Sequence, residues 1–189
     1  MINVFADNYT HANPARVSEL ASVWERNKNN PNINYTQFNN PTRMTYQDIF
    51  DKINERTGDD DINVISNLDI YFDESILTLN RINSNQFVAL SRWDIFDDGS
   101  IRFEGPKQFS QDTWAWRGKI RISDADFYLG VYACDNRIAA EAKIAGYHVF
   151  NPCHTIKTYH LHLTVGRAED FGITRVDPPH IVVWPQRWD

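Results

Sequence analysis

The feature that most constrains the fold is a regular alternation of strand-like and helix-like segments over the first 73 residues. Apolar and β-branched runs predict strands at 2–6, 33–38 and 62–66. Apolar residues at helical spacing predict helices at 15–28 and 45–57. This β-α-β-α-β order favours a parallel sheet with right-handed crossovers, which places the carboxyl ends of the three strands on one edge.

In the first of these helices, Val17, Leu20, Ala21 and Trp24 recur at helical spacing and predict its buried stripe. The signals after residue 73 are less regular. They predict a short helix or extended turn at 75–82, strands at 86–95, 100–103, 120–122 and 147–150, a helix at 135–145, and an alternating stretch at 155–164. We therefore predict an α/β fold in a single domain, with a Rossmann-type mixed sheet flanked by helices.

The composition limits the classes of function. A net charge of −6 disfavours a broad nucleic-acid surface, which needs a basic patch. No apolar run approaches about 18 residues, so no membrane-spanning helix is expected. The start of the chain lacks the basic and apolar regions of a signal peptide. Cys134 and Cys153 form no CxxC motif, which indicates a reduced protein in the cytoplasm, or in the host cytoplasm if the chain is viral.

The stretch from Asp61 to Asp73, DINVISNLDIYFD, carries the strongest candidate site. Asn67, Asp69 and Asp73 follow the apolar part of the third strand, and ligands of open α/β sheets bind outside the carboxyl ends of strands. A carboxylate beside a carboxamide suits a hard divalent cation that carries phosphates. We interpret Asn67-Leu68-Asp69 as a degenerate Asp-x-Asp site. The alternative is a simple turn, because Asn and Asp commonly start loops.

His160 and His162 form a second candidate group, because side chains at i and i+2 lie on the same face of a strand. Two imidazoles on one face can bind a transition metal or a phosphate. Equally, they can be ordinary side chains of a half-exposed strand. The sequence has no HExxH or CxxC frame that would indicate structural zinc.

Asp135 and Asn136 stand at the start of the helix expected at 135–145. An Asp at this point is favoured as a helix cap and by the helix dipole, which is the simpler interpretation. The functional interpretation is a carboxylate directed into a cleft, where it acts as a general base or holds an acceptor hydroxyl.

Arginines and tryptophans supply further candidates. Arg16, near the start of the first helix, can bind a diphosphate through two hydrogen bonds, or it can be an ordinary exposed helix residue. Arg92, Trp93, Gln111 and Asp112 combine an aromatic face with polar groups that can bind a sugar ring, although most aromatics pack in cores. The absence of GxGxxG, GxxxxGK[ST] and GxSxG motifs disfavours dinucleotide binding, P-loop binding and serine hydrolysis.

Several blocks of the chain, taken in order, resemble one protein family. The blocks are ISNLDIYFD, LSRWDI, SQDTW, a loop with Leu129-Gly130, and CDNRIAAEAKIAGYHVFNPCHTIKTYHLH. The family is that of small GT-A-type glycosyltransferases of bacteria and large DNA viruses, including the glycosyltransferase domains of chlorella viruses. The resemblance covers about residues 1–165. It implies a GT-A-like fold that binds a nucleotide-diphosphate sugar, usually with Mn²⁺ or Mg²⁺.

The resemblance also implies roles for single residues. Asn67-Leu68-Asp69 takes the Asp-x-Asp position, with Asp69 as the metal ligand. His160 resembles the C-terminal metal or diphosphate ligand, with His162 kept as the alternative. Asp135 resembles the carboxylate that opens the acceptor-side helix.

Other blocks map onto the two substrates. The segment from Asp7 to Arg16, with Asn8, resembles the nucleotide-contacting loop, and Gly130 resembles the glycine loop near the donor sugar. The chain departs from the family pattern in two ways: Asn67 replaces the first Asp of the motif, and the chain is short for a GT-A enzyme. A short chain implies an acceptor site that is thinly built or completed by a partner.

These inferences predict a metal-dependent glycosyltransferase that moves a sugar from a nucleotide-diphosphate sugar, of the UDP type, to a hydroxyl of a glycan. We divide the chain into a nucleotide-binding half at 1–73, a donor-sugar and acceptor half at 74–165, and a surface tail at 166–189. The alternative is a non-catalytic module, derived from such an enzyme, that binds a nucleotide sugar or carbohydrate. Fusion to, or a complex with, other glycosyltransferase domains is also expected.

Overall fold

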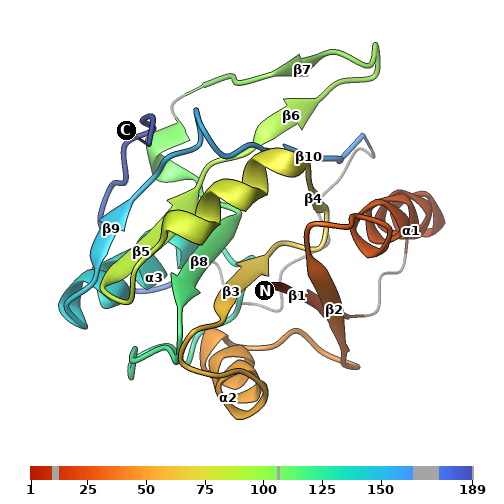
Figure 1. Ribbon diagram of the computed structural model, residues 1–189. Coiled ribbons are helices and arrows are strands. Elements are labelled where there is room, and N and C mark those ends of the chain that lie inside the picture. Colours follow the sequence, from red (N-terminus) through yellow and green to blue (C-terminus); the bar gives the residue numbers. More distant parts are fainter. Residues whose placement is uncertain (10–12, 106, 164–174, 189) are drawn as a thin grey trace.

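Six strands form the central sheet, in the order β2-β1-β3-β8-β5-β9 (Figure 1). The computed structural model describes residues 1–9, 13–105, 107–163 and 175–188. The elements in chain order are β1 (Ile2–Asn8), α1 (Pro14–Lys28), β2 (Asn34–Asn39), α2 (Tyr46–Arg56), β3 (Ile62–Ser66), β4 (Ile70–Phe72), the 3-10 helix η1 (Glu74–Arg81), β5 (Gln86–Leu90), β6 (Trp93–Ile95), β7 (Ile101–Arg102), the 3-10 helix η2 (Lys107–Phe109), β8 (Thr113–Arg117), α3 (Cys134–Ile144), β9 (His148–Phe150) and β10 (Thr158–His160).

The first three strands confirm the expected alternation. β1 is parallel to both β2 and β3, with Val4 opposite Tyr35 on one side and Val64 on the other. The carboxyl ends of these strands therefore lie on one edge of the sheet. β8 is antiparallel to both of its neighbours, β3 and β5, so the sheet as a whole is mixed, as predicted.

Two hydrophobic cores lie on the two faces of this sheet, because successive side chains of a strand point to opposite faces. On one face, α2 and α3 cover the sheet through residues such as Phe50 and Ile138, which belong to the same buried cluster as Trp116. On the other face, η1 packs Ile76 against Val64 and its neighbours. The helices thus flank the sheet on both sides (Figure 1).

Helix α1 starts where the sequence predicts, since the side chain of Asn13 accepts a hydrogen bond from the backbone N–H of Ala15 (3.0 Å). The predicted buried stripe is wrong in part. Leu20 is buried, but so are Val23 and Asn27, whereas Val17 is 48% exposed. The reason is that α1 packs largely against β4, and the Asn27 amide donates to a backbone carbonyl of that strand.

A second sheet, in the order β4-β10-β6-β7, stands beyond the carboxyl end of β3 (Figure 1). β4 follows β3 after a three-residue turn, Asn67–Asp69, and pairs antiparallel with β10. β10 is parallel to β6 on its other side. In this register His160 lies opposite Ile70 on one neighbour and Asp94 on the other, which carries a residue from late in the chain to the turn after β3.

The strand expected at 86–95 is wrong as a single element, because the chain leaves the central sheet at Ser91. β5 ends at Leu90, and β6 begins at Trp93 in the second sheet. Ser91 is fully buried, and its backbone N–H donates to the side chain of Asn151 (3.1 Å). A side chain therefore takes the hydrogen bond that a neighbouring strand would otherwise provide.

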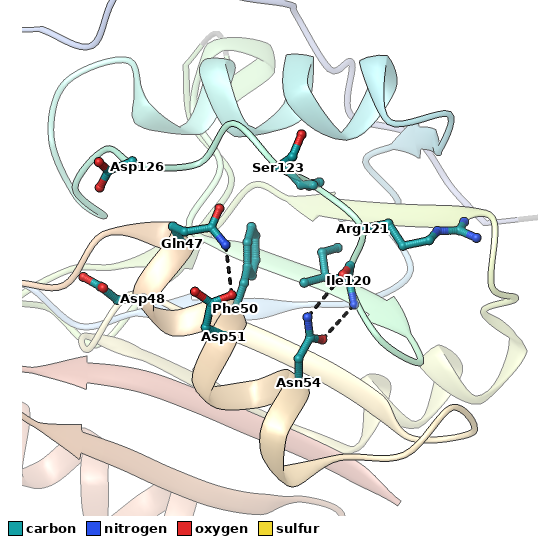
Figure 2. A pocket seen from close by; sticks show the side chains of 10 residues that line it. Gln47, Asp48, Phe50, Asp51, Asn54, Ile120, Arg121, Ser123 and Asp126 are labelled. Atoms are coloured by element: carbon teal, nitrogen blue, oxygen red, sulfur yellow. Dashed lines mark hydrogen bonds between the residues drawn. The ribbon is translucent and has the colours of Figure 1, made fainter.

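Residues 120–122 do not form the expected strand. The side chain of Asn54 accepts from the backbone N–H of Ile120 (3.0 Å) and donates to its carbonyl (3.2 Å), as Figure 2 shows. A helix side chain thus satisfies both backbone groups without a β partner. In the alternating stretch at 155–164, only β10 is a strand among the described residues.

The tail expected at 166–189 lies partly outside the described residues. Its described part runs beside α3 and β9, because Arg137 donates to the carbonyl of Asp177 (3.0 Å) and the ring of Trp188 packs edge-on against Phe150. No helix among the described residues is long and apolar enough to cross a membrane.

Among the glycines of the described residues, Gly118 is the one whose replacement we expect to disturb the fold most. Its φ is +75°, and a Cβ there would lie 2.7 Å from the backbone oxygen of Asp59. We expect Gly118→Ala to lower the free energy of unfolding by about 1–3 kcal/mol, measured by urea denaturation. Gly99→Ala is the matched control, because Gly99 has φ +77° but open space around it, and it should lose less. Equal losses would contradict the role of the close contact.

Candidate functional site

The turn after β3 directs the carboxylate of its last residue, Asp69, toward the protein interior. The backbone N–H of Asn67 donates to the carbonyl of Asp112 (2.9 Å), and Ile70 N–H donates back to Asn67 (3.2 Å). Leu68 is buried in a small cluster with Leu20 of α1. These contacts fix the turn, so Asp69, only 9% exposed, faces inward between α1 and β10.

Three basic side chains surround the Asp69 carboxylate. The guanidinium of Arg16 forms a short ion pair with its Oδ2. His160 Nε2 lies 3.1 Å from the same oxygen, and His162 Nδ1 lies 3.9 Å from it. Among the described residues, Asp69, His160 and His162 each offer one ligand atom within 4.8 Å of the others, an arrangement that could hold a metal ion.

Burial and close charges both shift the pKa values of this group. Burial alone would raise the pKa of Asp69, but His160 and Arg16 outweigh it and hold that pKa well below its ordinary range. Burial lowers the pKa of His160, yet the carboxylates of Asp69 and Asp94 outweigh burial and raise it to about 9. For His162, burial and the nearby Arg16 lower the pKa.

Further charged side chains lie on the other side of the His160 ring. Its Nδ1 lies 3.1 Å from Oδ1 of Asp94. The same oxygen accepts from Nε of Arg92 (2.8 Å), and Lys107 forms a short ion pair with the other carboxylate oxygen. Arg92 then donates from Nη1 to both oxygens of Asp112, at 2.9 and 3.0 Å.

This network extends to Asp135. Asp112 accepts from the side-chain amide of Asn67 (2.8 Å), which ties it to the turn after β3. Its neighbour Gln111 donates its backbone N–H to Oδ2 of Asp135 (3.1 Å). The structure therefore brings the candidates from six segments together in one bonded network: Arg16, Asn67, Asp69, Arg92, Gln111, Asp112, Asp135, His160 and His162.

Asp135 lies in the first turn of α3 but does not cap it. The capping position is Ala133, which has a left-handed φ of 66° and makes no side-chain cap. Asp135 accepts from the backbone N–H groups of Gln111 and Asn136. Burial raises the pKa of Asp135 to about 6 against the lowering effect of these two bonds.

Two of the nucleotide-binding candidates lie at the end of β1, with their own partners. Asp7 is buried and accepts from the backbone N–H of Met44 (2.7 Å) and from the amide of Asn40 (3.2 Å). Asn8 donates to Asn39 at the end of β2 (2.7 Å). These contacts join the end of β1 to the end of β2 and to the loop that follows β2, and they do not link either residue to Asp69.

Asp73 and Trp93 make contacts outside the bonded network. Asp73 caps η1, accepting from the backbone N–H of Ser75 (2.9 Å) and from the hydroxyl of Tyr159 (2.6 Å). The indole of Trp93 donates to the carbonyl of Cys153 (3.0 Å) and its ring packs against Phe103.

Gly130 and Asn136 lie at the edges of the network. Gly130 has φ +77°, and a Cβ there would lie 2.9 Å from the guanidinium of Arg43, which donates to the carbonyl of Leu129. Asn136 binds the tail, because its side chain donates to the carbonyl of Ile181 (2.9 Å).

Sequence reasoning missed Asp94, which contacts His160 and Arg92, and Lys107, which contacts Asp94. Asp94 had a usable signal, because it lies two residues after Arg92 and neighbours at i and i+2 share a face in extended chain. Lys107 had no such signal, because its contact with Asp94 arises only in the folded chain.

Two hollows lie apart from this network. The larger, of about 670 Å³, lies between α2 and the segment 120–126 and is shown in Figure 2. It is lined largely by polar side chains, including Gln47 and Asp51, which bond to each other (2.9 Å). The second, of about 410 Å³, includes Tyr128 and Arg137. Neither contains a residue of the bonded network.

Comparison with protein-family models and with curated proteins finds no match for this chain. The geometry of the site itself is therefore the basis for a functional proposal.

Proposed function

We propose that this protein is a metal-dependent glycosyltransferase of the GT-A type that its sequence resembles. The donor is a nucleotide-diphosphate sugar of the UDP type, and the acceptor is a hydroxyl of a glycan. The observation that carries this proposal is the convergence of Asp69, His160 and His162 just past the carboxyl end of β3. That edge is where open α/β sheets bind their ligands.

The side chains fit a divalent cation. Oδ2 of Asp69 contacts Arg16 and His160, whereas Oδ1 is buried and has no hydrogen-bond partner among the described residues. A buried carboxylate oxygen without a partner is uncommon, and a bound ion would satisfy it. Two imidazoles and one carboxylate suit Mn²⁺ better than Mg²⁺, which prefers oxygen ligands. When bound, the ion neutralises charge on the leaving diphosphate.

The surrounding residues supply charge and orientation. Arg16 projects from α1 to the Asp69 carboxylate and can also meet a diphosphate. Asn67 holds Asp112, and Asp112 holds Arg92, so a sugar hydroxyl that reaches these groups finds both donors and acceptors. In this proposal they bind and orient the donor.

Asp135 is the proposed acceptor-side residue. Its pKa of about 6 leaves it ionised at neutral pH, yet basic enough to take a proton from an acceptor hydroxyl. The bonds through Gln111 and Asp112 connect it to the donor side. In an inverting reaction Asp135 deprotonates the acceptor; in a retaining reaction it positions the acceptor.

A thermal-shift panel tests the proposal. A ligand that binds only the native state at 100 times its Kd raises the free energy of unfolding by about 2.7 kcal/mol. We expect UDP or a UDP-sugar to raise the melting temperature with Mn²⁺ and much less without it. Other nucleotide sugars in the same panel report the preference for base and sugar. The absence of a Mn²⁺-dependent shift for every nucleotide would contradict the proposed site.

One observation favours the second candidate, a non-catalytic binding module. The ion pairs of Asp69 with Arg16 and His160 hold the carboxylate without a metal, and His160 carries a proton at neutral pH that an ion must displace. Slow, Mn²⁺-dependent hydrolysis of a nucleotide sugar would favour the enzyme. Binding with no turnover of any kind would favour the module.

The location and partners stay part of the proposal. Both cysteines, Cys134 and Cys153, are free and buried, which agrees with a reducing compartment such as the cytoplasm. Fusion to, or a complex with, other glycosyltransferase domains stays a prediction.

A further inference from the structure

Asp94 occupies the centre of the charged network without being one of the residues that the proposed reaction uses. It lies in β6, directly beside His160 of β10 in the parallel register. Its Oδ1 lies 3.1 Å from His160 Nδ1 and accepts from Arg92 Nε (2.8 Å). Its Oδ2 is paired with Lys107. Three cationic or proton-donating groups therefore fix one carboxylate.

The two nitrogens of His160 face two different carboxylates. Nδ1 faces Asp94, and Nε2 lies 3.1 Å from Oδ2 of Asp69. A carboxylate can only accept, so the bond to Asp94 requires a proton on Nδ1. The contact with Asp69 likewise needs a proton on Nε2, so the ring carries both protons when no ion is bound. An ion at Asp69 would displace the Nε2 proton, and a ring that keeps its proton on Nδ1, held by Asp94, presents the lone pair of Nε2. That lone pair is then directed at the site formed by Asp69 and His162.

From this geometry we propose that Asp94 is a positioning residue, which holds the His160 ring and its tautomer so that Nε2 faces a metal ion bound at Asp69. The proposal rests on the metal site of the proposed function. Carboxylates that accept from the far nitrogen of a metal-binding histidine orient the ring, and their loss typically weakens metal affinity about 10–100-fold.

Arg92 and Lys107 explain why Asp94 can play this part. Lys107 is buried, and its ammonium reaches Asp94 from the segment after β7. Arg92 also pairs with Asp94 and is itself held by Asp112, so the Asp94 carboxylate cannot rotate away from His160 without breaking its ion pairs with Arg92 and Lys107. The orientation of His160 is thereby tied to the rest of the network.

Titration of Mn²⁺ into the nucleotide-free protein, followed by calorimetry and by electron paramagnetic resonance of free Mn²⁺, tests the proposal. We expect Asp94→Ala to weaken Mn²⁺ binding about 10–100-fold. Asp94→Asn removes the charge but keeps a carbonyl oxygen that accepts from Nδ1, so it should restore much of the affinity. Equal losses in the two variants would show a charge effect alone and overturn the positioning role, as would wild-type affinity in the Ala variant.

Lys107→Met is the matched control, because it removes one partner of Asp94 but leaves the bond to His160. With Lys107 gone, Arg92 still holds the Asp94 carboxylate toward His160, so Mn²⁺ affinity should change far less than in Asp94→Ala. A loss as large as that of Asp94→Ala would indicate a general disturbance of the network and contradict the proposal.

Circular dichroism checks that each variant is folded, and Asp94→Asn keeps the test decisive if the Ala variant unfolds. If the wild type binds no Mn²⁺, the metal site itself fails, and the role of Asp94 fails with it; if the wild type binds and only the variants disagree, the metal site stands.

Discussion

Replacing Asp69 with Asn is expected to abolish Mn²⁺-dependent binding of UDP. Removing the carboxylate deletes the oxygen ligand itself, so the loss should exceed the ~10–100-fold that follows loss of a residue that only orients a ligand. Asn keeps the size of the side chain and one acceptor for Arg16 and His160. Asp69→Ala would leave both groups without their buried partner, at about 3–5 kcal/mol of stability. Isothermal titration of UDP with and without Mn²⁺ measures the effect.

Asp73→Asn is the matched control for this experiment. Asp73 belongs to the same stretch but caps η1 and bonds to Tyr159, away from the Asp69 cluster. Asn is also a good capping residue, so the fold should be retained. UDP binding of this variant should keep its Mn²⁺ dependence. Metal-stimulated binding that persists in Asp69→Asn would overturn the assignment of Asp69.

The fold could be predicted mainly where the sequence pattern is local. The alternation of β1 to β3 with α1 and α2 follows from apolar spacing and caps, and the structure confirms it. The predictions failed where a distant side chain takes over backbone hydrogen bonds. Asn151 does so at Ser91, where the expected strand splits, and Asn54 does so at Ile120, where no strand forms. A side chain that is distant in sequence leaves no periodic signal.

Residues of the candidate site could be predicted where a polar or charged side chain follows a strand or belongs to a recognised motif. Asp69 and His160 are 91 positions apart, and the register of β4 with β10 brings them together. Their pairing was expected only through the family resemblance. Trp93 was a candidate on residue type alone; its indole bonds to the carbonyl of Cys153, and its role in binding a sugar stays a prediction. Residue type indicates what a side chain can do, and packing decides where it points.

Replacing Asp135 with Asn is expected to leave donor binding intact and to reduce sugar transfer by about 10²–10⁴-fold, the usual contribution of a general base. The Asn side chain retains a carbonyl oxygen for the backbone N–H of Gln111, so α3 should keep its place. Steady-state transfer and UDP titration, measured on the same preparation, separate the two effects. Asp124→Asn is the control, because that carboxylate is largely exposed and pairs with Arg137, away from the bonded network.

The pH dependence tests the same role independently. Burial raises the pKa of Asp135 from 3.8 to about 6, and a base acts only when ionised, so kcat/KM of the wild type should rise with pH and level off above about 6. Because the folded state binds this proton more tightly, the free energy of unfolding should fall as pH rises from about 4 to about 6. Asp135→Asn should remove both effects. A transfer rate that stays high in the variant, or that keeps the wild-type profile, would exclude Asp135 as the base and leave acceptor deprotonation to another group.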